Sequence, residues 1–256
     1  MRENRLLRQL RNGETAYGIG LGLPSYPVAE ALARQGYQWF YVDGQHYPLT
    51  YEQMALMCAA VWANGATPII RVPWFGLDHI QQALDAGAGG VMVPVVNTPE
   101  EAEAIVQTAK FPPRGIRSKG GVLHAAAFNT DTATYFARAN DETLVIVQLE
   151  TREAIVHAEE ILSVDGIDVV SIGPNDLAAS FGYAEAEAWQ QDEFANAIRS
   201  VVTAAERTGK VAGIGARSVE RAQEWAVAGF RMLTIGTDLG ILTGAAGDLA
   251  RELGLI

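Results

Sequence analysis

Short runs of β-branched and other apolar residues alternate eight times with longer stretches of helical spacing, and this alternation constrains the fold most strongly. Repeated strand and helix units form parallel sheets covered by helices. Most runs are apolar throughout, as strands buried on both faces are. Eight units favour a closed (β/α)8 TIM barrel of the α/β class. The predicted strands are Ala16–Leu21, Trp39–Asp43, Thr67–Val72, Gly90–Val96, Leu144–Leu149, Val169–Ile172, Val211–Ile214 and Met232–Ile235.

The length of the chain agrees with this fold. It has 256 residues, and one such barrel needs roughly 250, so we expect residues 1–256 to form a single barrel domain. Two segments interrupt the alternation, 111–140 and 181–193, and neither indicates a domain boundary. Plausible helix N-caps precede several of the helical stretches: Ser25, Thr98, Thr151 and Ser218.

Composition excludes several classes of protein. The net charge of −11 argues against a nucleic-acid partner or an acidic membrane surface. No stretch resembles a signal peptide or a membrane span, so we expect a cytoplasmic protein. The single Cys58 excludes an internal disulfide, and within a predicted helix over residues 51–64 it is expected to be a small core residue.

Four predicted strands end in, or lead directly into, reactive side chains: His46, Arg71, Glu150 and Asp176. The carboxyl ends of barrel strands converge on one face, so these side chains become neighbours although the sequence separates them widely. Histidine is the side chain whose ordinary pKa of about 6.5 lies nearest neutrality. The pattern therefore predicts a reactive site at this face.

Glu150 and Asp176 together indicate a divalent metal. Each alone could be an acid at a helix N-terminus, where the backbone dipole favours negative charge. Two acids on adjacent strand ends repel each other unless a cation lies between them. Carboxylate oxygens suit Mg²⁺ or Mn²⁺, with open positions for a substrate that has adjacent carbonyl and carboxylate oxygens.

Motifs along nearly the whole chain resemble those of the HpcH/HpaI aldolases, the metal-dependent class II pyruvate aldolases of the 4-hydroxy-2-oxoheptanedioate and 2-keto-3-deoxy-sugar acid type. They occur in the family's order: Val42-Asp43-Gly44-Gln45-His46, Arg71-Val72-Pro73, Val93-Pro94, Pro112-Pro113-Arg114-Gly115-Ile116-Arg117, Gln148-Leu149-Glu150-Thr151 and Ile172-Gly173-Pro174-Asn175-Asp176-Leu177.

The resemblance implies a function and an assembly. The function is to cleave or form 4-hydroxy-2-oxo acids from pyruvate and an aldehyde, through a pyruvate enolate stabilised by Mg²⁺, Mn²⁺ or Co²⁺. The assembly is a trimer or hexamer of barrels in which the last helix is exchanged between subunits.

The resemblance also implies roles for individual residues. Glu150 and Asp176 would hold the metal, His46 would be the base, and Arg71 would stabilise the developing charge. The keto acid would contact Gln148, Gly173, Asn175 and Asp176. Gln45 departs from the family, which usually has glutamate there, and it removes a negative charge beside His46.

Asp85 is harder to place. The resemblance makes it the acid that raises the basicity of His46, yet it lies between a predicted helix and the fourth strand, at the far rim of a simple barrel. Either a neighbouring subunit supplies it, or it is a structural acid at a helix end. The segment 117–124 also follows a helix, so we expect it to reach a partner's pocket.

The same strand ends bear on alternative functions. A lysine Schiff base is disfavoured, because none of the three lysines, Lys110, Lys119 and Lys210, ends a strand. An oxaloacetate decarboxylase or a CoA-ester lyase on the same barrel remains open, although the chain clusters no basic residues for CoA phosphates. A binding module or scaffold without catalysis has no need for His46, Arg71, Glu150 and Asp176 together.

Two features near the predicted mouth bear on the second substrate. Gly215 and Gly236 follow the last two strands, where barrels often bind phosphate, but tight turns explain these glycines more simply. The aromatic residues Tyr47, Trp74 and Phe75 follow strand ends and predict a preference for less polar aldehydes.

Overall fold

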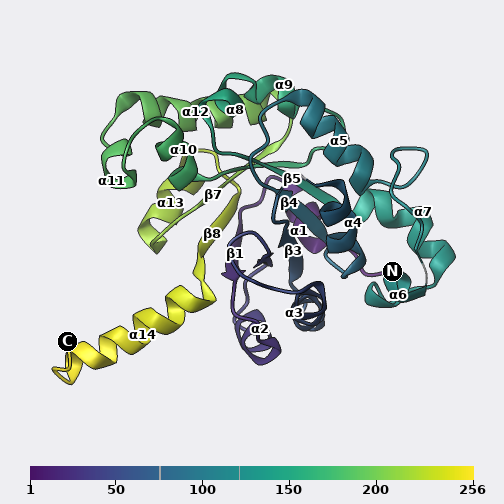
Figure 1. Ribbon diagram of the computed structural model, residues 1–256, viewed down its shortest axis with the longest axis horizontal. Coiled ribbons are helices and arrows are strands. Elements are labelled where there is room, and N and C mark those ends of the chain that lie inside the picture. The colour runs from purple at the N-terminus through teal and green to yellow at the C-terminus, as the bar shows by residue number, and fades with distance from the viewer. Residues whose placement is uncertain (75, 121) are drawn as a thin grey trace.

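Eight parallel strands close into a barrel in the computed structural model, which describes residues 1–74, 76–120 and 122–256 (Figure 1). Strands that are consecutive in sequence are neighbours in the barrel, and the last strand pairs with the first. The predicted (β/α)8 architecture is therefore confirmed. The strands are β1 (Ala16–Leu21), β2 (Trp39–Asp43), β3 (Thr67–Arg71), β4 (Gly90–Val93), β5 (Leu144–Leu149), β6 (Val169–Ile172), β7 (Val211–Gly215) and β8 (Met232–Thr237).

Helices surround the barrel in Figure 1. They are α1 (Arg5–Arg11), α2 (Tyr26–Ala33), α3 (Tyr51–Ala63), α4 (Leu77–Asp85), α5 (Pro99–Ala109), α6 (Val122–Ala127), α7 (Thr132–Glu142), α8 (Arg152–Val156), α9 (Ala158–Leu162), α10 (Pro174–Ser180), α11 (Glu185–Ala188), α12 (Asp192–Thr208), α13 (Val219–Val227) and α14 (Asp238–Glu252). In the part of the chain that the structure describes, no helix is both long and apolar enough to span a membrane.

The predicted strand bounds differ most from the structure at β4. This strand ends at Val93, three residues before the predicted Val96. Val95 has a φ of 55°, a left-handed conformation that a β-branched residue rarely adopts and that a strand does not contain. Its N–H donates to the Glu150 carboxylate at 2.8 Å, so the early end of β4 directs backbone towards the predicted site.

Side-chain caps fix where the helices begin after the strand ends. Each predicted N-cap accepts a backbone N–H from the first turn of its helix, and Thr98 also forms a reciprocal capping box with Glu101. The predicted caps are therefore confirmed: Ser25, Thr98, Thr151 and Ser218.

The barrel wall separates two apolar cores. The larger core lies between the strands and the helices and includes Cys58, which is buried as predicted. The smaller core fills the barrel interior, where Trp39 and Met232 pack against the apolar face of α1. Leu6, on α1, is fully buried there. Helix α1 therefore closes the amino-terminal end of the barrel and leaves the carboxyl end open.

Helix α14 leaves the barrel and extends away from it (Figure 1). Its apolar side chains are largely exposed, with Leu242 58% and Leu249 61% exposed. Among the described residues, its hydrogen bonds to the barrel are at its start, where buried Asp238 accepts from the backbone N–H groups of Gly22 and Leu23. An amphipathic helix in this state has an apolar face without a partner.

Candidate active site

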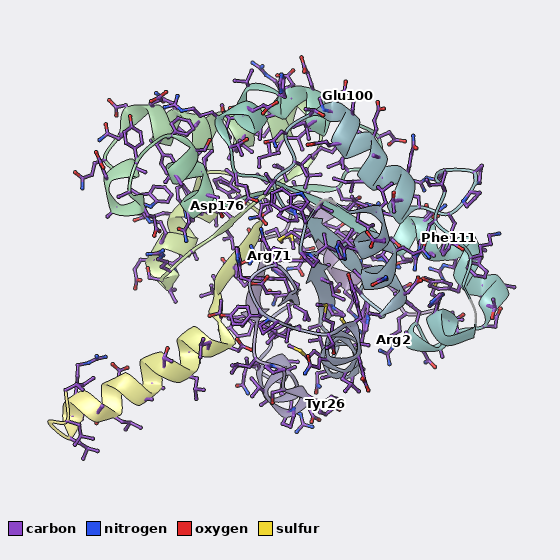
Figure 2. All side chains as sticks on the ribbon, in the orientation of Figure 1. Arg2, Tyr26, Arg71, Glu100, Phe111 and Asp176 are labelled. Atoms are coloured by element: carbon purple, nitrogen blue, oxygen red, sulfur yellow. The ribbon has the colours of Figure 1, made fainter. Side chains whose placement is uncertain are left out.

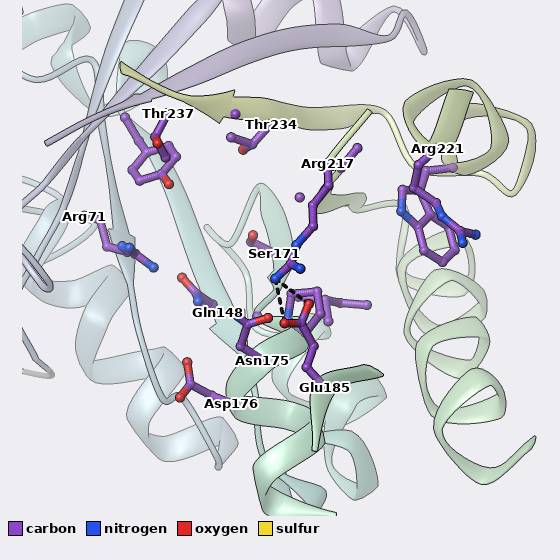
Figure 3. Close-up of a pocket in the computed structure, with 18 of the residues that line it drawn as sticks. Arg71, Gln148, Ser171, Asn175, Asp176, Glu185, Arg217, Arg221, Thr234 and Thr237 are labelled. Atoms are coloured by element: carbon purple, nitrogen blue, oxygen red, sulfur yellow. Dashed lines mark hydrogen bonds and ion pairs between the residues drawn. The ribbon is translucent and has the colours of Figure 1, made fainter. Parts of the chain in front are cut away.

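A pocket of about 670 Å³ opens at the carboxyl ends of the strands. Figure 2 shows Arg71 and Asp176, which are far apart in sequence, at this end of the barrel, whereas Phe111 lies on its outer side. Most of the predicted site residues line this pocket, and Figure 3 shows several of them pointing into it: His46, Arg71, Gln148, Gly173, Asn175 and Asp176.

The ends of β2 and β3 hold Arg71 in a fixed orientation. Asp43 and Arg71 are register partners on the two strands. Arg71 donates to the buried Asp43 carboxylate through Nε at 3.0 Å and through Nη2 at 2.7 Å. This bidentate pairing raises the pKa of Arg71 although burial opposes it, so a permanent cation faces the pocket.

Asp43 also organises the loop that carries His46. Its Oδ1 accepts hydrogen bonds from the backbone N–H groups of Gln45, at 3.0 Å, and His46, at 3.3 Å. The imidazole of His46 is exposed and lines the pocket. The Gln45 side-chain oxygen is buried and has no hydrogen-bond partner among the described residues. The sequence analysis gave Asp43 no role in the site, although two adjacent strands that end in Asp43 and Arg71 could have predicted their ion pair.

Glu150, at the end of β5, is 1% exposed and is not among the described residues that line the pocket, but its carboxylate lies against Gln148 and Gly173, which do line it. Its carboxylate accepts from the N–H of Val95 and from Gln148 Nε2 at 2.6 Å. Burial, assisted by the nearby negative charge of Asp176, raises the pKa of Glu150 to about 7 despite these bonds. A carboxyl group in this state gains from a neighbouring cation.

The surroundings of Glu150 fit a divalent metal. The oxygen of Gln148 is buried without a hydrogen-bond partner among the described residues. A β-carbon at Gly173 would overlap Glu150 Oε2 and lie 2.7 Å from Gln148 Nε2, so glycine keeps this space free. The described residues contain no cluster of three or more possible histidine, cysteine or acidic ligands. A metal here would therefore depend on two carboxylates and on oxygens from substrate and water.

Asp85 lies outside the pocket. It is the last residue of α4, and it pairs with Arg117 Nη2 at 2.7 Å and with His124 Nε2 at 3.5 Å in the same chain. Arg117 is buried, and its guanidinium stacks over Phe111. Within one chain Asp85 therefore binds the segment that follows α5, and its supply to another subunit's His46 stays a prediction.

The wall between α11 and α13 contains residues that sequence reasoning missed. Arg217, just beyond β7, pairs with Glu185 at 2.6 Å. When the amide of Asn175 is turned so that its nitrogen faces Glu185, it donates to both carboxylate oxygens, at 3.0 and 3.2 Å. Two indoles, Trp189 and Trp225, complete this wall. Glu185 and Trp189 belong to the segment 181–193, and its break in the regular alternation of strands and helices was the sequence feature that could have identified them.

Of the aromatic residues expected at the mouth, Tyr47 and Trp74 do not line the pocket. Trp74 is 57% exposed and does not line the pocket, and the ring of Tyr47 lies over Gly22. Phe75 lies outside the described residues. Among the described residues, the aromatic side chains that line the pocket are those of Tyr41, Trp189 and Trp225.

The two glycines at the carboxyl ends of β7 and β8 lie within these strands, and no tight turn requires them, contrary to the simpler explanation. Neither Gly215 nor Gly236 has a positive φ. A β-carbon at either position would meet no heavy atom of the described residues within 4 Å. Both glycines line the pocket, so their effect is to widen it.

The lysines lie away from the pocket, as predicted. None is among the described residues that line it. Lys110 is buried, where its Nζ donates to the carbonyl oxygens of Asn140 and Thr143 at 2.8 Å each. Burial lowers the pKa of Lys110 to about 8, but a lysine committed to backbone carbonyls outside the pocket cannot form a Schiff base there.

Comparisons with known proteins agree over nearly the whole chain. The family model HpcH/HpaI aldolase/citrate lyase matches residues 21–245. A 4-hydroxy-2-oxo-heptane-1,7-dioate aldolase from Escherichia coli is 34% identical over 252 residues, covering 98% of this chain and 95% of that protein. A hydroxypyruvate/pyruvate aldolase from Delftia acidovorans is 37% identical over 237 residues, covering 93% and 87%. A solved structure of an HpcH/HpaI aldolase/citrate lyase family protein from Burkholderia cenocepacia has a TM-score of 0.91 at 33% identity, covering 98% and 99%.

Proposed function

Because the chain belongs to the HpcH/HpaI aldolase/citrate lyase family, we propose that it is a divalent-metal-dependent aldolase that cleaves or forms 4-hydroxy-2-oxo acids from pyruvate and an aldehyde. As an enzyme it is a carbon–carbon lyase. The observation that carries the assignment is the convergence of His46, Arg71 and Asp176 on one pocket, whose lining contacts the buried Glu150. Histidine, guanidinium and paired carboxylates are the groups that this reaction needs.

The base is His46. In the cleavage direction a base removes the proton from the C4 hydroxyl, the C3–C4 bond breaks, and the aldehyde leaves. The electron pair of that bond becomes the enolate of pyruvate, which then takes a proton at C3. An exposed imidazole at the pocket can accept and return such protons, which contributes typically about 10²–10⁴-fold in rate.

Arg71 stabilises the negative charge that develops on the enolate oxygen. Asp43 holds the guanidinium before the reaction starts, so no reorganisation is needed when the charge appears. Glu150 and Asp176 would hold a divalent cation such as Mg²⁺ or Mn²⁺, which when bound supplies further positive charge beside the keto oxygen. We assign contacts with the keto acid to Gln148, Gly173, Asn175 and Asp176.

The pocket also has room for the aldehyde. Pyruvate contains six non-hydrogen atoms, whereas the pocket measures about 670 Å³. The additional space lies along the wall formed by Glu185, Trp189 and Arg217, with Gly215 and Gly236 keeping it open. We place the aldehyde there, because the opposite side is occupied by the groups that act on pyruvate.

The active protein is proposed to be a trimer or hexamer. The exposed apolar face of α14 supports this assembly, since exchange of α14 between subunits would bury Leu242 and Leu249 against a neighbouring barrel. Asp85 and the segment 117–124 would then reach the neighbour's pocket.

The test is the exchange of the pyruvate methyl protons for deuterium in D₂O, monitored by proton NMR. This half-reaction needs no aldehyde. We expect exchange with Mg²⁺ or Mn²⁺, no exchange with EDTA, and a loss of about 10²–10⁴-fold in His46→Ala. An exchange rate that EDTA does not change would show that the reaction does not need a metal. A complete lack of exchange, with decarboxylation of oxaloacetate or cleavage of a CoA ester instead, would favour the alternative activities.

A further inference from the structure

Strand β1 has two glycines on the face that lines the barrel interior, after Ala16, which packs in the interior core. Gly18 and Gly20 are two residues apart and so share the inner face of the strand. Their register partners on β2 are Trp39 and Tyr41. A β-carbon at Gly18 would overlap the indole of Trp39. A β-carbon at Gly20 would lie 2.6 Å from both Cζ and the hydroxyl oxygen of Tyr41. The two glycines therefore make room for the two aromatic rings of β2.

These rings lead from the core to the pocket. Trp39 is 1% exposed and belongs to the interior core. The ring centroids of Trp39 and Tyr41 are 6.2 Å apart. The guanidinium carbon of Arg71 lies 5.2 Å from the centroid of the Tyr41 ring, and both Tyr41 and Arg71 line the pocket. Arg71 thus has an aromatic ring against its face and a carboxylate, Asp43, along one edge.

We propose that Tyr41 is a positioning residue for Arg71: its ring, seated in the space left by Gly20, supports the face of the guanidinium while Asp43 fixes the edge. The inference rests on the proposed function, in which Arg71 stabilises the enolate. With Nε and Nη2 bound to Asp43, Nη1 makes no hydrogen bond with the described residues and is free to face substrate. A guanidinium held in this way keeps its donor directed at the developing charge.

The support comes from the face of a neutral ring. Burial raises the pKa of Tyr41 to about 12, although the charge of Arg71 opposes the rise, so the phenol stays protonated at neutral pH. The attraction is then that of a cation for an aromatic face, and the hydroxyl is not required for it. Phenylalanine at position 41 should therefore still support the guanidinium of Arg71, whereas an aliphatic residue should not.

The experiment compares methyl exchange of pyruvate in three full-length variants with the wild type, all with Mn²⁺. Tyr41→Leu should lose about tenfold in exchange rate at saturating pyruvate, and Tyr41→Phe should stay within about twofold of wild type. Tyr17→Leu is the matched control, because Tyr17 lies on β1 and packs against the outer core. It should leave exchange unchanged.

A mutant cycle tests whether Tyr41 acts through Arg71. In an Arg71→Lys background, which keeps the charge but loses the planar guanidinium, Tyr41→Leu should cost less than about twofold further. Gly20→Ala should displace the ring and so reduce exchange in the wild-type background, but have much less effect once Tyr41 is leucine.

Three results would overturn the inference while leaving the proposed function standing. They are full activity in Tyr41→Leu, an equal loss in Tyr41→Phe, which would assign the effect to the hydroxyl, and additive losses in the Tyr41 and Arg71 cycle. No exchange in the wild type would instead defeat the proposed function. In that case the free energies of unfolding in urea are compared for the wild type, Tyr41→Leu, Arg71→Lys and the double variant. Non-additive losses of stability would show coupling between Tyr41 and Arg71 and support the inference, and additive losses would reject it.

Discussion

Asp43 shows how one side chain can organise a site without being its reactive group. It holds the guanidinium of Arg71 through two hydrogen bonds and the backbone of His46 through a third. Its burial at 3% exposure strengthens these interactions, because water does not compete for the carboxylate. The positions of the proposed base and the proposed cation therefore depend on the same carboxylate.

Glu150 provides the test of the metal site. Glu150→Gln keeps the shape of the side chain but removes the charge, so we expect at least about 100-fold weaker Mn²⁺ binding in the presence of pyruvate, measured by calorimetry. Glu153→Gln, on the neighbouring helix α8, is the matched control and should bind as wild type does. Equal Mn²⁺ affinity in Glu150→Gln and wild type would exclude Glu150 as a ligand.

Gly215 provides the test of the aldehyde wall. Gly215→Leu should fit without strain, since a β-carbon there meets no described atom within 4 Å and the glycine has no positive φ. The new side chain would occupy pocket volume, so KM should rise about tenfold for long aldehydes. Methyl exchange of pyruvate alone should not change. A loss of exchange would instead indicate that Gly215 lies at the pyruvate end.

At the scale of elements, one end of the barrel is closed by apolar packing and the other carries the candidate site. Helix α1 fills the amino-terminal end with apolar side chains, and the carboxyl end is left to loops with polar groups. Strand β2 joins the two: Trp39 belongs to the interior core, Tyr41 lies above it, and Asp43 lies at the site. The alternation of a strand places all three on its inner face.

Helix α1 should contribute stability and not catalysis. Leu6 is fully buried in the interior core, so Leu6→Ala should lower the free energy of unfolding by about 2–5 kcal/mol. The exchange rate per folded molecule should stay that of wild type. Val227→Ala, at a position that is 90% exposed, is the control in urea unfolding. Comparable destabilisation by the two substitutions would mean that α1 does not close the barrel.

At the scale of the whole molecule, charge is distributed so that most cations are paired. The chain has 19 basic and 30 acidic residues, and Arg217, at the pocket, is paired with Glu185. Arg71 and Arg221, the other arginines among the described residues that line the pocket, are also paired with carboxylates, which weighs against a large polyanion such as a CoA ester as substrate.

Lys110 should make stability depend on pH. Burial lowers its folded pKa to about 8 from an ordinary 10.5, so between these pH values the unfolded chain binds more protons than the folded one. Stability contributed by this group therefore rises with pH through that window. The difference in unfolding free energy between wild type and Lys110→Met should grow in favour of wild type from pH 8 to 10.5, measured by urea titration. A constant difference would contradict the shift.

Helix α14 should determine the oligomeric state. A charge on its apolar face opposes burial against another subunit, so the double substitution of Leu242→Glu and Leu249→Glu should give a smaller assembly in light scattering after gel filtration. Val156→Glu, at another exposed apolar position on α8, should keep the wild-type mass. A wild-type protein that is monomeric at micromolar concentration would reject the exchange of α14.

The sequence alone was sufficient for the architecture and for much of the site. Eight apolar runs define a barrel because a strand covered on both faces must be apolar along its whole length. The rule that parallel strands deliver their carboxyl ends to one face then brings His46, Arg71 and Asp176 to one pocket, as the structure shows.

Only the tertiary structure decided what depends on distance between side chains. Asp85 pairs with Arg117 within this chain, a contact that its place between a helix and a strand did not predict. The support of Arg71 by Tyr41 depends on the space above Gly20, and the aldehyde wall depends on how Glu185 meets Arg217. Periodicity reports which face a residue occupies, whereas contacts between faces depend on packing, which no local pattern in the chain encodes.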